Sequence, residues 1–147
     1  MDYNIDLWDL VGADHIGGIA KVYYKHSVGA IIVCDAKSPK LIPNVLNWKE
    51  DIDSKVRFPN GNKIPMVLIA NMNEDDGDDD VDTEKITKFC KQYGFVCDEQ
   101  DNEAFIACVS DKDDSFIIHN AITDLAKKVL LEPGILVREK AMPGEVR

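Results

Sequence analysis

Carboxylates are the most concentrated chemically active groups in this sequence, and they gather between residues 73 and 84. Eight of these twelve residues are acidic, and oxygen ligands of this kind are the ones that Ca²⁺ prefers. Their spacing does not fit the loop of an EF-hand, because taking Gly77 as its required glycine puts Met72 at the first ligand position and Thr83 at the last. We therefore predict a solvated, self-repelling acidic loop, with calcium buffering as the alternative.

Thiols and imidazoles are too scattered to predict a metal centre. The cysteines are Cys34, Cys90, Cys97 and Cys108, and the histidines are His15, His26 and His119. They form no CxxC pair and show no spacing typical of zinc ligands. Cys34 and Cys108 lie inside apolar runs, so we interpret them as small core residues of a chain in a reducing compartment. We expect no metal site.

Four apolar runs alternate with three helical patterns along the chain. The expected strands are residues 5–10, 30–34, 66–70 and 104–109, and the expected helices lie near residues 41–56, 83–93 and 115–131. In the first helix, Leu41, Val45 and Trp48 begin an apolar face. Thr83 is expected to cap the second helix and Gly94 to end it. Strands that alternate with helices predict an α/β fold with a mostly parallel sheet.

Composition and charge limit the partners of this chain. Its formal charge is −10, and such a field repels phosphate backbones and anionic lipid, so we expect no nucleic-acid partner. No apolar stretch approaches the roughly 20 residues that cross a bilayer. The sequence starts with no signal peptide and ends with no cysteine for prenylation, so we expect no direct membrane anchor.

The length of 147 residues and the hydrophobic fraction of 45% predict one domain with its own core. We place this domain at residues 1–132 and a tail at 133–147. The lack of secretory and membrane signals predicts an intracellular protein, either cytoplasmic or associated with an organelle such as the mitochondrion.

Five short motifs, in order, resemble those of Rab-type small GTPases. LWDLVGAD at 7–14 is similar to the W-D-x-x-G-Q-E motif, and VYYK with VGA at 22–30 is similar to a Y-Y-R/K…G-A run. WKEDIDSK with PNG at 48–61, LIAN at 68–71 and FCKQYGFV at 89–96 resemble the Rab subgroup of lysosome-related organelles and mitochondria. The resemblance covers about residues 4–131. It implies a Ras-like, P-loop-NTPase type of Rossmann sheet with about four strands and flanking helices.

The resemblance also implies phosphate-site positions, and one of them is altered. Asp9 matches the residue that helps to hold magnesium, and Gly12 matches the glycine that meets the γ-phosphate. Ala13 replaces the glutamine that orients the attacking water, which a methyl group cannot do. We therefore expect no catalytic residue.

The base-binding motifs are altered as well. Asn71 keeps the first position of N-K-x-D, but Met72 replaces its lysine and Glu74 its aspartate. The longer side chain displaces a carboxylate that must make a bidentate hydrogen bond.

Ser110, Asp111 and Lys112 stay close to the family's S-A-K, with one added negative charge. These residues are residual nucleotide contacts at most. In the simpler alternative, Asp9, Asn71 and Ser110 cap turns at strand ends. We expect no cofactor, with GTP or GDP and Mg²⁺ as the alternative.

The family's GxxxxGK[ST] phosphate loop has no match in these residues, and six residues precede Leu7. The resemblance therefore implies a sheet without the family's strands 1 and 2 and helix 1, and no GTPase activity. The expected strand at 5–10 then has three options. It pairs with the strand at 29–35, it stays a bare edge, or it accepts a partner's strand.

Aromatic and aliphatic residues near the start of the chain are candidates for partner binding. Trp8 and Tyr23 match two members of the aromatic triad through which Rabs meet effectors, and Ile16 matches an apolar residue of that surface. Ile5 and Leu7 belong to the edge left uncovered. Aromatic residues are frequent interface anchors, but each of these two aromatics is also explained as core.

Two functions therefore stay open. The first is a non-catalytic pseudo-GTPase that acts as a subunit of a larger assembly, with a stable protein partner covering the exposed sheet edge. The second is a guanine-nucleotide-binding switch of membrane traffic, whose phosphate site is completed by another chain or by a segment outside this sequence.

Overall fold

Three strands and three helices make up the described part of the chain. The computed structural model describes residues 3–10, 24–73, 81–108 and 114–135. In chain order, the elements are β1 (Ala30–Asp35), α2 (Leu41–Lys55), β2 (Met66–Asn71), α3 (Thr83–Tyr93), β3 (Phe105–Ala107) and α4 (Ser115–Leu130). This alternation confirms the predicted α/β class. The division into a domain at 1–132 and a tail at 133–147 stays a prediction.

The strands form one parallel sheet in the order β1-β2-β3. β1 pairs with β2 from Ala30 opposite Met66 to Asp35 opposite Asn71, and β2 pairs with β3 over a shorter stretch. β2 is therefore the central strand. Its residues 66–70 are all buried, which is what a continuous apolar run predicts for a strand covered on both faces.

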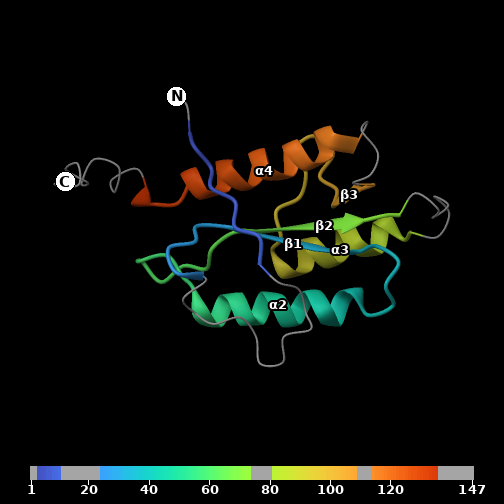
Figure 1. The fold of residues 1–147 in the computed structure, drawn as a ribbon, viewed down its shortest axis with the longest axis horizontal. Coiled ribbons are helices and arrows are strands. Elements are labelled where there is room, and N and C mark those ends of the chain that lie inside the picture. Colours follow the sequence, from blue (N-terminus) through green and yellow to red (C-terminus); the bar gives the residue numbers. More distant parts are fainter. Residues whose placement is uncertain (1–2, 11–23, 74–80, 109–113, 136–147) are drawn as a thin grey trace.

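Helices cover both faces of this sheet. Figure 1 shows α4 on one side and α2 and α3 on the other. The larger core lies on the α2 and α3 side and includes Val45, Leu68 and Phe89. The smaller core lies under α4 and includes Val67 and Leu125. Because successive strand residues point to opposite faces, β2 contributes to both cores.

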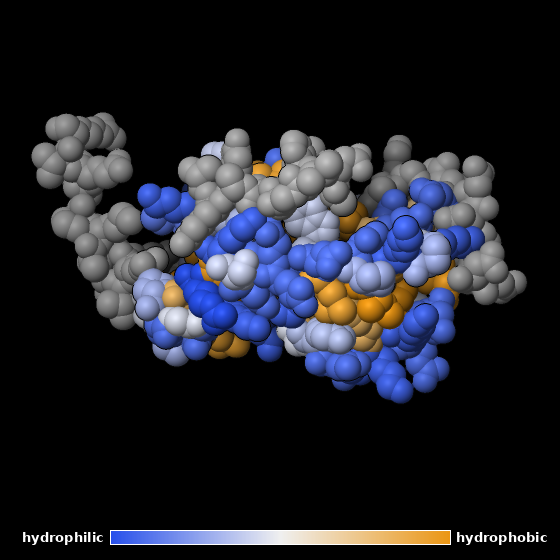
Figure 2. Space-filling model, turned by 90° about the horizontal axis from the view of Figure 1, so that it is seen from below, coloured by the Kyte–Doolittle hydropathy of each residue, from blue (hydrophilic) through white to orange (hydrophobic). Residues whose placement is uncertain are grey.

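The helices on the α2 side turn a polar surface outward. Seen from that side, the described surface is largely hydrophilic, with an apolar area exposed near its centre (Figure 2). This arrangement is typical of amphipathic helices that pack one apolar face on a sheet. Among the described residues, no helix is long and apolar enough to cross a membrane.

Residues 5–10 do not form the strand that their pattern predicts. They have no regular secondary structure and pair with none of the described strands. Figure 1 shows this segment, in blue, running across the strands rather than along them. The described sheet therefore has three strands instead of about four. An apolar run needs a neighbouring strand to pair its N–H and C=O groups, and the described residues provide none.

The ends of the helices follow the predicted chemistry with one shift. Asp82, and not Thr83, caps α3, because its Oδ1 accepts a hydrogen bond from the backbone N–H of Lys85 at 2.9 Å. Gly94 ends the helix in the left-handed region at φ 75°, as predicted. A residue without Cβ adopts this conformation without strain.

All four cysteines are free thiols. Burial raises the pKa of Cys90 to about 12 and that of Cys34 to about 11. The neighbouring thiols of Cys97 and Cys34 add to the first shift, and Asp35 adds to the second. The core interpretation is only partly right, because Cys34 and Cys108 are half-buried. At neutral pH, the thiols of Cys90 and Cys34 are protonated and unreactive.

Replacing Asp82 with alanine should lower the free energy of unfolding by about 1 kcal/mol, because it removes a side-chain acceptor at a helix N-terminus. Thr83→Ala is the matched control and should change it by less than about 0.5 kcal/mol. Urea denaturation followed by circular dichroism measures both. A larger loss in Thr83→Ala than in Asp82→Ala would contradict the assignment of the cap.

Native Cys90 should react with iodoacetamide at least about tenfold more slowly than the same cysteine in the denatured chain near pH 8, because its raised pKa leaves little thiolate. Peptide mass spectrometry measures the labelling of each cysteine. The rate should increase as the pH approaches the raised pKa. Rapid labelling of Cys90 in the native protein would show that its surroundings are not those described.

Candidate functional site

The carboxyl ends of the three parallel strands meet at one edge of the sheet. Two backbone hydrogen bonds continue the pairing just past the strands, from Ala36 N–H to the carbonyl of Asn71 at 2.8 Å and from Met72 N–H to the carbonyl of Ala107 at 2.9 Å. In open α/β sheets, ligands bind outside the carboxyl ends of the strands. We name this region the carboxyl edge.

Asn71 lies at the carboxyl edge as the last residue of β2 and is half-buried. It is the one position of the altered base motif that both matches the resemblance and falls within the described residues. Glu74 lies outside them. Asn71 already interacts with its surroundings, so a ligand would have to share or replace these interactions.

Ser110, Asp111 and Lys112 lie outside the described residues, but Cys108 and Asp114 on either side of them are described. Cys108 N–H donates to Oδ2 of Asp114 at 2.8 Å, which joins the residue after β3 to the residue before α4. Sequence reasoning missed Asp114 in this role. Its position directly before a helix was the available signal, although its carboxylate bonds to Cys108 instead of capping α4.

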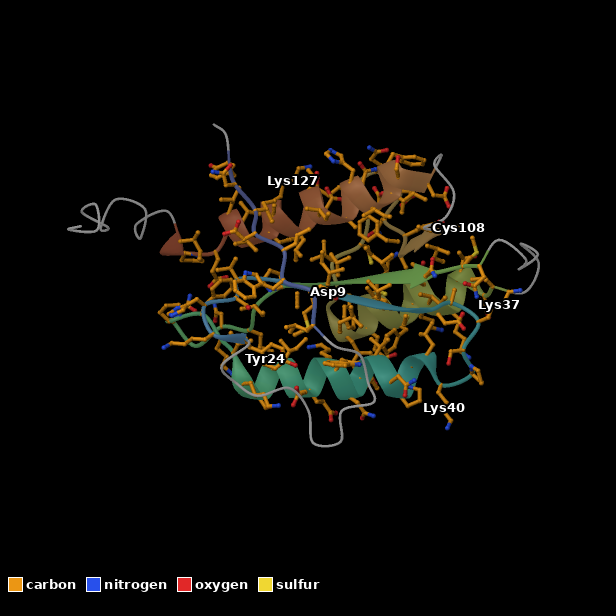
Figure 3. The ribbon with its side chains drawn as sticks, in the orientation of Figure 1. Asp9, Tyr24, Lys37, Lys40, Cys108 and Lys127 are labelled. Carbon is orange, nitrogen blue, oxygen red and sulfur yellow. The ribbon has the colours of Figure 1, made fainter. Side chains whose placement is uncertain are left out.

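Asp9 does not join the carboxyl edge. Figure 3 places Asp9 near the middle of the molecule, whereas Lys37 and Cys108 lie at the end toward which the strands run. Asp9 is also exposed. Of the positions matched to nucleotide contacts, the described residues therefore bring only Asn71 to this edge.

The remaining predicted positions cannot be placed in the structure. Outside the described residues lie Gly12, Ala13, Ile16, Tyr23, Glu74, Ser110, Asp111 and Lys112. Within the described ranges, no group of His, Cys, Asp and Glu side chains is arranged to hold a metal. One amide side chain does not make a nucleotide site, so the described residues on their own do not fit a guanine nucleotide with Mg²⁺.

The segment at the start of the chain presents apolar side chains to solvent. Ile5 is 51% exposed, Leu7 66% and Trp8 81%. For Trp8, the alternative of a plain core residue is wrong. Because Leu10 packs against the larger core, this segment is anchored at one end. We call Ile5, Leu7 and Trp8 the N-terminal apolar segment.

β1 exposes a further apolar side chain, that of Val33, at the outer edge of the sheet. Val33, in the middle of the strand, is 61% exposed, while its neighbour Ile32 is buried. α4 packs mainly against β2 and β3, and Val33 stays exposed. No described strand pairs with the outer side of β1. We call this outer side the β1 edge.

Tyr24 joins the chain before β1 to helix α2. It is buried, its hydroxyl donates to Oδ2 of Asp51 at 2.9 Å, and the ammonium group of Lys55 lies 5.7 Å from the centre of its ring. Lys55 also forms an ion pair with Asp51. Burial, followed by the bond to Asp51, raises the pKa of Tyr24 well above its usual range. The sequence motif around Tyr24 therefore has a structural role at this residue.

Comparison with known proteins identifies the family. The Ras family model matches residues 1–129. The chain is 42% identical over 92 residues to Ras-related protein Rab-32 of Homo sapiens, covering 63% of this chain and 41% of the relative. It is 38% identical over 93 residues to Rab-32B of Dictyostelium discoideum, covering 63% and 35%.

A third relative gives the same result. Identity to Ras-related protein Rab-7L1 of Homo sapiens is 33% over 98 residues, covering 65% of this chain and 48% of the relative. The chain thus spans less than half the length of these relatives. The three-stranded parallel sheet with helices on both faces is consistent with part of a Ras-like fold. The chain belongs to the Ras family and is of the Rab type.

Proposed function

We propose that this chain is a non-catalytic, Rab-like interaction subunit of a larger protein assembly. The observation that carries the proposal is the exposure of apolar groups at two features, the N-terminal apolar segment and the β1 edge. Soluble proteins seldom expose large apolar side chains together unless these side chains form an interface. A stable protein partner that buries both features would remove these apolar side chains from water.

The sequence at the family's functional positions supports the absence of catalysis. Ala13 offers no group to orient a water molecule. Met72 has no charge with which to support a bound base, and Glu74 sets its carboxylate one methylene further out than an aspartate does. Each change removes a different contact, so their combination weakens both the chemical step and base recognition.

Trp8 is the side chain in the N-terminal apolar segment most suited to anchor a partner. A tryptophan that leaves water for an interface buries 150–250 Å² of largely apolar surface, as a rule, and also offers an N–H donor. Tryptophan is enriched among the residues that dominate binding energy. Because Trp8 is the most exposed large apolar side chain described, burying it removes more apolar surface from water than burying its neighbours does.

Trp8→Ala should leave the stability of the isolated protein within about 0.5 kcal/mol of wild type, because the side chain makes little contact in the folded chain. The same change should remove the protein from its assembly. Size-exclusion chromatography of native extract, with detection of the tagged chain, measures the share that elutes above the mass of the monomer. We expect this share to fall at least about tenfold.

Phe116→Ala is the matched control, since Phe116 is an aromatic residue 60% exposed on α4 and belongs to neither proposed feature. This variant should keep the wild-type elution. Two results would contradict the proposed function. One is a wild-type chain that elutes as a monomer in extract, and the other is a Trp8→Ala chain that stays in the assembly to the same extent.

A second candidate is a guanine-nucleotide-binding switch whose phosphate site is completed elsewhere. The observation that favours it is the position of Asn71 at the carboxyl edge, where the N–H of Met72 donates to the carbonyl of Ala107 at the end of β3. Ser110 and Lys112, which match the family's base motif, follow β3 in the sequence. Under this hypothesis, the carboxyl edge would hold the base, and another chain or segment would hold the phosphates.

Nucleotide content separates the two candidates. The proposed function predicts that heating the purified protein releases no GDP or GTP, and that millimolar GTP with Mg²⁺ leaves its melting temperature unchanged, because a ligand that does not bind the native state cannot stabilise it. Chromatography of the heated supernatant and a thermal-shift assay measure both. Stoichiometric nucleotide, together with a thermal shift that Asn71→Ala abolishes, would establish the switch and overturn the proposal.

A further inference from the structure

The backbone of β1 shows what kind of structure its outer side can accept. Ala30 N–H donates to the carbonyl of Pro65, and Ala36 N–H donates to the carbonyl of Asn71, both in the direction of β2. Backbone groups alternate along a strand, so Ile31 and Val33 direct their N–H and C=O groups away from β2, and Asp35 directs its N–H there, while its carbonyl accepts from the N–H of Ser38. Within the described residues, no strand pairs with these groups. A helix cannot satisfy such a row, whereas an extended chain can.

Two side chains along this row indicate which residues a strand paired with β1 would need. Val33 and Asp35 are both exposed, and they point to the same face of the sheet because they are two residues apart. The carboxylate of Asp35 accepts a hydrogen bond from the N–H of Lys37 at 2.9 Å, a local turn contact that leaves its charge in place. An added strand would meet an aliphatic position and then an acidic one.

From this geometry we propose that the β1 edge binds an extended segment of a partner protein, with an aliphatic residue opposite Val33 and a lysine or arginine two positions away, opposite Asp35. The inference rests on the proposed function and specifies the partner's chemistry. Directly opposed side chains of matching kind stabilise a strand pair, and opposite charges do so as well. The formal charge of −10 adds attraction for a basic segment.

A second copy of this chain is a poorer occupant of the same edge. The sequence of β1, AIIVCD, contains no basic residue, so pairing two β1 strands offers no partner for the carboxylate of Asp35. Two chains of −10 also repel each other as they approach. Self-association through β1 is therefore a result that the experiment below must exclude.

The synthetic peptide acetyl-Thr-Val-Thr-Lys-Thr-Val-Thr-amide carries valine and lysine two positions apart, so that both lie on one face of a paired strand, and it tests the proposed chemistry on the intact 147-residue chain. It should bind and shift the backbone amide signals of Ile31, Val33 and Asp35 in NMR spectra. Three control peptides should bind at least about tenfold more weakly, the difference worth 1.4 kcal/mol. One carries glutamate in place of lysine, one is a Thr-Val-Lys-Thr-Thr-Val-Thr scramble that puts lysine and valine on opposite faces, and one is N-methylated at alternate residues to block its hydrogen bonds.

Two variants of one residue test whether backbone pairing carries the binding. Val33→Pro removes the outward N–H and leaves the pairing with β2 intact, since proline is tolerated on an edge strand when its nitrogen faces solvent. Val33→Ala shortens the side chain but keeps the N–H. Peptide binding should fall at least about tenfold in Val33→Pro relative to Val33→Ala, while both variants keep the circular dichroism spectrum of the folded protein.

The possible results either overturn the inference alone or overturn the proposed function as well. Equal binding of lysine and glutamate peptides, equal binding of the scramble, or equal binding by the two variants would each overturn the inference. Concentration-dependent dimers in sedimentation that Val33→Pro abolishes would assign the edge to a second copy and also overturn it. If Val33→Pro and wild-type chains remain in the same assembly in extract, the inference fails while the proposed function stands. If the wild-type chain is a monomer there, the proposed function itself fails.

Discussion

The burial of β2 is the interaction on which the rest of the structure depends. Residues 66–70 are covered on both faces, and burying each large aliphatic side chain among them contributes roughly 1.5–3 kcal/mol. The same strand pairs with β1 on one side and with β3 on the other. It therefore joins the two cores, fixes the carboxyl edge, and makes β1 an outer strand whose other side pairs with no described strand.

The sequence was sufficient where local chemistry decides the structure. Continuous apolar runs predicted β1, β2 and β3, and helical spacing with Gly94 predicted the helices. It was insufficient at residues 5–10, because strand formation depends on a neighbour that a local pattern cannot reveal. Trp8 lies in this segment, with which no described strand pairs, and its side chain is exposed. The predicted cap of α3 was wrong by one residue, Thr83 instead of Asp82, because both residue types cap helices.

The candidate site was predicted less completely than the fold. Asn71, which matches the first position of the family's base motif, is the last residue of β2, and its role as a nucleotide contact stays a prediction. Alignment with family motifs grouped Asp9 with Asn71, yet Asp9 lies away from the carboxyl edge (Figure 3), because the coil that carries it crosses the sheet instead of joining it. The bond between Cys108 and Asp114 was not foreseen, since a carboxylate before a helix usually caps that helix. Motif order alone therefore does not define a site in this chain.

Amide hydrogen exchange along β1 tests the central claim, that the outer side of this strand is a binding edge. In the isolated chain, the amides of Ile31 and Val33, which point outward, should exchange fast, and those of Ile32 and Cys34, which bond to β2, should exchange slowly. In the native assembly, Ile31 and Val33 should become as slow as their neighbours. Slow exchange of Ile31 and Val33 in the isolated chain, or exchange that stays fast in the assembly, would contradict the account.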